Sequence, residues 1–94
     1  PMSAESIFAA VQEECLPGIW SKGVALTRVD GAVILDAERG SELQLRVQVP
    51  GKPVSPKVTL WVDDDDTFCN CGAKVEPCEH VAAAVIALKA GRLA

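Results

Sequence analysis

Three cysteines and the only histidine of this 94-residue chain lie within twelve residues near its C-terminus. They are Cys69, Cys71, Cys78 and His80. Thiolate sulfur and imidazole nitrogen are donors that Zn²⁺ prefers, and structural zinc sites hold four of them in a tetrahedron. Four protein donors leave no coordination position for water or a substrate, so such a site is structural and not catalytic. These residues therefore predict one structural zinc ion.

The backbone around these residues must bring two separate pairs of donors to one ion. Side chains two residues apart on an extended strand point to the same side, which suits the first pair of cysteines. The second pair, Cys78 and His80, would be separated by about 200° in a regular helix. Pro77 favours an extended approach that places Cys78 just before a helix and His80 in its first turn. Gly72 can supply a sharp turn between the two pairs.

Two other interpretations of the same residues stay open at this point. Cys69 and Cys71 could form a small disulfide, with His80 an ordinary exposed helix residue, or the four residues could cluster by chance without a metal. The sequence shows no export signal, so we expect a reducing, cytoplasmic location, where thiols are more often metal ligands than disulfides. The fourth cysteine, Cys15, falls on an apolar helical stripe and is expected to be a buried small hydrophobic residue.

The chain contains Cys-x-Cys, then six residues, then Cys-x-His, and the aliphatic run at 81–86 follows directly. This pattern resembles the SWIM zinc finger. The resemblance covers residues 69 to about 90 and implies that the four donors bind zinc in a short hairpin packed on a helix. The upstream strands are similar to those before the finger in bacterial proteins fused to helicase-like ATPases, with Lys22-Gly23 in place of an Arg-Gly pair. Membership of this family implies an interaction module for protein or DNA partners within a larger polypeptide.

Two helices are expected at the ends of the chain. In the first helix, apolar residues recur at helical spacing after Ser3, which can cap the N-terminus. Pro17-Gly18 ends this helix. The second is rich in alanine and runs from about Glu79 to Ala90, with Gly91 directly after it. Its expected apolar stripe consists of Val81, Ala84, Val85 and Leu88.

Short runs of β-branched and apolar residues between the helices predict about four strands. Their expected ranges are Val24–Val29, Ala32–Ala37, Glu42–Val49 and Lys57–Val62. Asp30-Gly31 is expected to close a hairpin between the first two strands, and Arg39-Gly40-Ser41 a hairpin between the next two. Apolar and polar residues alternate in the third strand, which is typical of an antiparallel strand with one buried face.

These elements predict an α+β fold with an N-terminal helix, a small antiparallel sheet of about four strands, and a zinc-binding hairpin packed on a C-terminal helix. Residues 1–2 (Pro1-Met2) have the character of a cloning scar. Residues 3–62 are expected to supply the first helix and the strands. Residues 63–94 are expected to form the zinc finger, in one compact domain with the strands. A chain of this size buries a thin core, so stabilisation by a metal is expected.

The charge of the chain favours proteins over nucleic acids as partners. There are thirteen acidic against nine basic residues, a net charge of −4, and Asp63–Asp66 lie shortly before Cys69. DNA phosphates approaching that end would meet like charge. We expect a structural zinc module that mediates protein-protein or intramolecular domain interactions within a larger intracellular protein. The alternative is a DNA-binding zinc finger that guides a helicase-like ATPase or another nucleic-acid enzyme, with Arg46 and Lys57 on adjacent strands as a basic face.

Three further expectations concern activity, membranes and an exposed aromatic residue. We expect no enzyme, because the sequence has no Ser/His/Asp set, phosphate-binding glycine loop or second histidine. No apolar run approaches the roughly 18 residues of a membrane span. Trp61 falls on the polar face of its strand, and we expect the N-terminal helix or the finger's helix to cover that face, in preference to a partner.

Overall fold

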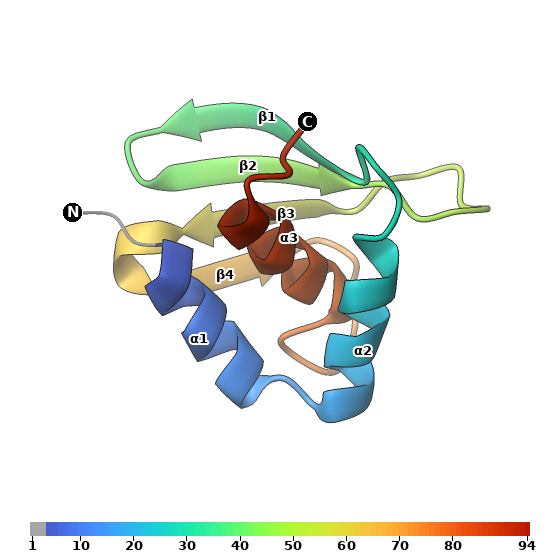
Figure 1. The fold of residues 1–94 in the computed structure, drawn as a ribbon, viewed down its shortest axis with the longest axis horizontal. Helices are drawn as coiled ribbons and strands as arrows, with labels where there is room; N and C mark the ends of the chain where they lie inside the picture. Colours follow the sequence, from blue (N-terminus) through green and yellow to red (C-terminus); the bar gives the residue numbers. More distant parts are fainter. Residues whose placement is uncertain (1–3) are drawn as a thin grey trace.

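The computed structural model describes residues 4–94 of the chain (Figure 1). In this range the helices are α1 (Ala4–Glu14), α2 (Pro17–Leu26) and α3 (Glu79–Ala90). The strands are β1 (Val33–Arg39), β2 (Glu42–Val47), β3 (Lys57–Trp61) and β4 (Asp66–Cys69), and a short 3₁₀ turn, η1 (Val62–Asp64), joins β3 to β4. The predicted α+β class with N-terminal helix, four-stranded antiparallel sheet and C-terminal helix is confirmed. The predicted scar at Pro1-Met2 and the cap at Ser3 lie outside the described residues.

The four strands form one antiparallel sheet in the order β1-β2-β3-β4. Its register places Leu43 opposite Leu60 and Val58 opposite Cys69, so alternate residues of neighbouring strands face the same side. On that side the apolar residues of the two central strands are buried: Leu43, Leu45, Val47, Val58 and Leu60. The alternation predicted for the central strands is confirmed, and their apolar face forms one wall of the core.

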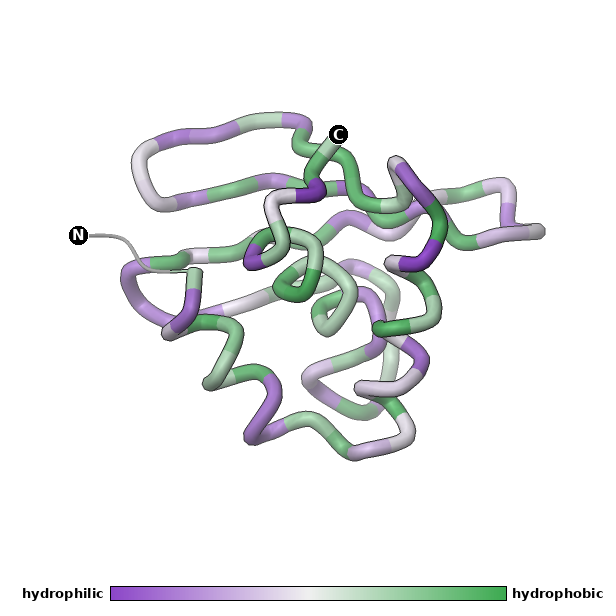
Figure 2. The backbone as a smooth tube through the Cα atoms, viewed as in Figure 1, coloured by the Kyte–Doolittle hydropathy of each residue, from purple (hydrophilic) through white to green (hydrophobic). Residues whose placement is uncertain are grey.

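α3 fills the space between the buried face of the sheet and the other two helices, which pack on its remaining sides (Figure 1). It is coloured as apolar along almost its whole length in Figure 2. Every residue from Val81 to Val85 is buried, as is Ala87. The predicted stripe of α3 was too narrow, because a helix covered on three sides needs small or apolar residues almost all round.

The first half of the segment predicted as the strand Val24–Val29 is the end of helix α2, and a turn follows from residue 27. α2 begins at Pro17, where the missing N–H of proline costs nothing because the first residues of a helix have no acceptor for it. The helix then lies so close to α3 that a Cβ built on Gly23 would be 2.6 Å from the Cβ of Ala82. Packing of this helix on α3 overrides the strand preference of its β-branched residues.

Phe8, on α1, contacts a side chain of each of the other two helices. Its ring and the Trp20 ring pack in a T-shaped arrangement, 5.2 Å between centroids and 81° between planes, which joins α1 to α2. The ammonium group of Lys89, near the end of α3, lies 4.1 Å from the centre of the Phe8 ring. Both arrangements are favourable for aromatic rings, whose faces carry partial negative charge.

The hairpin predicted at Arg39-Gly40-Ser41 is confirmed, with Gly40 at φ +59° between β1 and β2. Asp30-Gly31 does not close a hairpin, because it joins α2 to β1. The fourth strand of the sheet is β4, which the sequence analysis treated as the end of an acidic loop and the start of the finger. Its first residue, Asp66, is exposed at the sheet edge, so β4 lacked the apolar run used to predict strands.

The prediction that a helix covers Trp61 is wrong. α3 packs on the face that carries Val58 and Leu60, and the alternation of β3 places Trp61 on the opposite face. The indole there is half-buried, and its N–H donates to the carboxylate of Glu42 at 3.1 Å. The outer face of the sheet is therefore a largely polar surface, on which Trp61 is held by a cross-strand hydrogen bond and Phe68 is exposed.

Candidate metal centre

The four predicted donors are presented by the end of a strand, a turn and the start of a helix. Cys69 is the last residue of β4, and Cys71 lies in the turn that follows. Gly72 continues the turn with φ +73°, as predicted. Cys78 has the extended conformation expected of it, with φ −88° and ψ 176°, and caps the N-terminus of α3. His80 lies in the first turn of that helix.

The donor atoms converge on one point. The Cys Sγ atoms and a ring nitrogen of His80 all lie within 4.8 Å of one another. The Nδ1 atom of His80 is 3.8 Å from Sγ of Cys69 and 3.7 Å from Sγ of Cys78. A tetrahedron built with Zn–S of about 2.3 Å and Zn–N of about 2.0 Å has donor-to-donor edges of roughly 3.5–3.8 Å. The group fits this geometry and is positioned to bind one zinc ion.

The thiol groups of this cluster are unequal in their affinity for protons. A hydrogen bond from the Cys69 thiol lowers the pKa of Cys78 to about 4, aided by the backbone amides of Val81 and His80 at the start of α3. The same hydrogen bond, with burial, raises the pKa of Cys69. Cys78, at the helix N-terminus, is therefore the thiol most readily held as a thiolate, and a zinc ion at this group would require the other two thiols to lose their protons as well.

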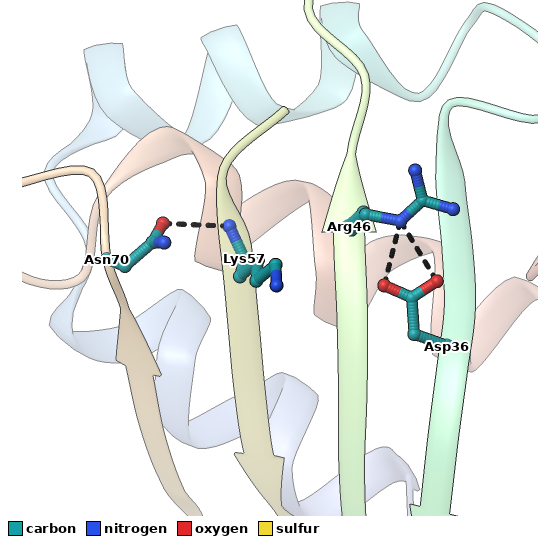
Figure 3. Close-up of polar contacts among 4 residues, drawn as sticks. All are labelled: Asp36, Arg46, Lys57 and Asn70. Carbon is teal, nitrogen blue, oxygen red and sulfur yellow. Dashed lines mark hydrogen bonds and ion pairs between the residues drawn. The ribbon is translucent and has the colours of Figure 1, made fainter. Parts of the chain in front are cut away.

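Asn70 holds the turn between the first two cysteines against β3. Its side-chain oxygen accepts a hydrogen bond from the backbone N–H of Lys57 at 2.8 Å (Figure 3). Its own backbone N–H donates to the carbonyl of Lys57 at 3.1 Å. These two bonds extend the ladder beyond β4 and fix the direction of the turn. This role of Asn70 was not predicted from the sequence, although asparagine is a common turn residue.

Cys15 is buried, as predicted, and its thiol is not part of the four-donor group. The thiol points to the carbonyl oxygen of Pro77 at 3.8 Å, so the end of α1 rests against the segment that precedes Cys78. Burial, and then the negative charge of Cys78, raise the pKa of Cys15. The four cysteines are free thiols, so the alternative of a Cys69–Cys71 disulfide does not describe this structure.

The charged residues around the finger are arranged largely as expected. Asp63–Asp66 are exposed in the connection between β3 and the first donor. Arg46 and Lys57 are direct cross-strand neighbours on the outer face of the sheet, the basic pair considered from sequence (Figure 3). The Nε atom of Arg46 lies 2.9 and 2.8 Å from the two carboxylate oxygens of Asp36. The positive charge of Arg46 is therefore balanced within the sheet.

Comparison with known families agrees with this geometry. Residues 46–89 match the family model of the SWIM zinc finger, from the end of β2 almost to the end of α3. The match covers just under half of the chain and includes all four donors. No curated protein and no solved structure gives a significant match. The resemblance to the finger is thus confirmed, and the similarity to helicase-fused bacterial proteins stays a prediction. Within residues 4–94, no helix is long and apolar enough to cross a membrane.

Proposed function

We propose that this SWIM zinc finger, with the helices and strands packed around it, is a zinc-stabilised module that binds proteins. Its partner is another protein or another domain of the same larger intracellular polypeptide. The closed donor set carries this proposal, because three thiols and one imidazole fill a tetrahedral site. A zinc ion held in this way supplies folding free energy, on the order of 10 kcal/mol in small zinc domains, and shapes the surface around it.

The charge around the metal centre supports a protein partner. Zinc with three thiolates and a neutral imidazole carries a charge of about −1, which adds to the net −4 of the chain. The exposed Asp63–Asp66 lie close to the first donor. Nucleic-acid binding depends on positive charges that replace counterions on the phosphates, and this end of the molecule offers the opposite sign.

A salt titration with DNA tests the proposal. The zinc-loaded protein is titrated into fluorescent 20-mer duplex and single-stranded DNA at several salt concentrations. At about 0.15 M salt we expect no saturation below roughly 100 µM protein, the weak end of non-specific DNA binding. Micromolar binding with a steep loss of affinity as salt rises would contradict the proposal.

A positive test requires a defined partner. Proteins that co-purify with the tagged, zinc-loaded module are expressed separately, and their affinity is measured by calorimetry. We expect micromolar or tighter binding that is lost in the His80→Ala variant, because the surface around the metal no longer forms. If the His80→Ala variant bound the partner as tightly as the unsubstituted protein, the zinc-stabilised surface would have no role in binding.

One observation favours the alternative function, a DNA-binding finger that guides a helicase-like ATPase. Lys57 and Arg46 lie side by side on the sheet face that also presents Trp61 and the exposed ring of Phe68. Basic and aromatic side chains on a sheet are a common platform for single-stranded nucleic acids. The ion pair between Arg46 and Asp36 weakens this candidate. If it were correct, Lys57→Gln would reduce DNA affinity and the salt dependence together.

A further inference from the structure

A groove of about 510 Å³ lies beside the metal centre. Its walls are the end of α1 at Glu14, the strand β4, and the 70–78 segment that connects the two pairs of donors. This volume falls in the range of cavities that hold small molecules or single side chains of a partner, roughly 300–1,000 Å³. It is far larger than a zinc ion requires, so the groove extends well beyond the metal site.

The charged residues that line the groove are acidic, and Lys74, an exposed base in the 70–78 segment, is not among them. Three carboxylates line the groove, from Glu14, Asp66 and Glu76, and the described lining residues include no lysine, arginine or histidine. The ion pairs found in residues 4–94 are Asp36–Arg46 and Asp30–Arg92, so the three groove carboxylates have no cationic partner there. The three cysteines of the metal centre also line it, and with bound zinc they add negative charge.

The position of Glu14 does not favour the helix that carries it. Glu14 is the last residue of α1, where the unpaired backbone carbonyls already give the helix end a partial negative charge. The last turn of α1 contains no basic residue to offset this. A carboxylate at this place costs stability, which is expected where a charge serves recognition instead of folding.

Phe68 borders the groove at the free edge of β4, where the register of the strand places its ring toward the outer face of the sheet. The Phe68 surface is 54% exposed there. Large apolar side chains at the rim of an acidic groove can contact the aliphatic stem of a lysine or arginine while the carboxylates meet its charged end.

We propose that this groove binds a basic segment of a partner protein, with a lysine or arginine side chain between Phe68 and the carboxylates of Glu14 and Glu76. The inference rests on the proposed function and specifies the chemistry of its partner. Charge complementarity selects this occupant, because an anionic strand would meet three carboxylates and a negative metal centre. Phe68 supplies the apolar contact and the carboxylates select the positive charge.

The test is an NMR titration of the ¹⁵N-labelled, zinc-loaded protein with a capped nonapeptide of alternating lysine and leucine. A nonapeptide with glutamate in place of lysine serves as the comparison. We expect the lysine peptide to shift amide signals of Glu14, Phe68 and the 72–76 segment, with a dissociation constant of about 100 µM or tighter. The affinity should fall when salt is raised to about 0.5 M, because the Debye length shortens.

Substitutions in the groove identify the contacts. Glu14→Gln and Glu76→Gln should each weaken binding about two- to fivefold, as expected for exposed ion pairs. Phe68→Ala should weaken it about fivefold or more, as for an aromatic anchor. The matched controls are Glu38→Gln on β1 and Val54→Ala in the exposed 48–56 connection, which remove an exposed carboxylate and an exposed apolar side chain outside the lining of the groove. Zinc content and the NMR spectrum confirm that each variant is folded.

The outcomes separate this inference from the function on which it rests. Four results would each overturn the groove as the binding site: equal binding of both peptides, signal shifts confined to β1 and β2, no binding, or groove variants that bind as well as the controls. If the DNA titration is also negative, the protein-binding function still stands. Micromolar, salt-dependent DNA binding would instead overturn the function itself, whatever the peptide does.

Discussion

At the residue scale, the metal centre could be predicted because its information is local. All four donors come from twelve consecutive positions, and Pro77 and Gly72 set the backbone between them. The extended backbone at Cys78 and the positive φ of Gly72 follow from those two residue types. Asn70 was missed because its partner, Lys57, is thirteen positions away and the contact needs the register of the sheet.

The donors should be separable from the remaining cysteine by substitution. Cys78→Ser and His80→Ala remove a donor and should reduce the zinc content from one per chain to a small fraction, with loss of folded structure in the last third. Cys15→Ala is the control, since its buried thiol is outside the donor group. It should keep the full zinc content and cost about 1 kcal/mol at most through lost packing. Mass-spectrometric metal analysis and circular dichroism measure both properties.

Full zinc retention in either donor variant would show that the substituted residue is not a ligand. Loss of zinc in Cys15→Ala would show that the assignment of the four donors is incomplete.

Asn70 should contribute measurably to stability through its bond to the backbone of Lys57. Asn70→Ala removes the acceptor and should lower the free energy of unfolding by about 1 kcal/mol. Asn70→Asp keeps an acceptor oxygen and should recover most of the loss. The matched control is Gln48→Ala, because Gln48 is exposed. Urea unfolding of the zinc-loaded proteins measures the difference, and an alanine variant as stable as the control would contradict this role.

At the scale of elements, the strands in which apolar and polar residues alternate were predicted correctly. The elements whose conformation depends on contacts with distant parts of the chain were not. β2 and β3 have a regular alternation that any solvent-facing antiparallel sheet requires, so their faces followed from the sequence. α2 was mistaken for a strand because its helical state depends on the close contact of Gly23 with α3. β4 was missed because it is short and begins with an aspartate at a sheet edge.

The contact between α2 and α3 gives a paired prediction at two glycines of one helix. Gly23→Ala would place a methyl group 2.6 Å from the Cβ of Ala82 and 3.0 Å from the backbone nitrogen of Ala83, so the helices must separate. The expected loss is about 1–3 kcal/mol in the free energy of unfolding. Gly18→Ala meets nothing within 4 Å and should stabilise the protein by up to about 1 kcal/mol through helix propensity.

Urea unfolding of the zinc-loaded variants measures both changes. Equal stability of the two variants would show that α2 does not lie against α3 as described.

At the scale of the whole molecule, the metal centre and the core are one structure. The first turn of α3 carries a donor, and the rest of α3 contacts α1, α2 and the sheet. The sequence could not reveal this central position, because it predicted a helix with one narrow apolar stripe. A metal bound at the start of α3 therefore stabilises the packing of every other helix and strand.

Removal of the metal should for this reason affect the entire molecule. A strong chelator at neutral pH is expected to abolish most helical circular dichroism in one cooperative transition, and stoichiometric zinc should restore it. Magnesium at the same concentration is the control, because it prefers oxygen donors and should restore nothing. A chelated protein with an unchanged spectrum and unchanged thermal stability would contradict a structural role for the metal.

The central claim is that Cys69, Cys71, Cys78 and His80 bind one structural zinc ion. The most direct measurement is the metal content of protein purified under reducing conditions, combined with mass mapping of disulfides. We expect one zinc per chain, with Cys69 and Cys71 as free thiols protected from alkylation until the metal is removed. Protein without zinc, with a disulfide between Cys69 and Cys71, would contradict it.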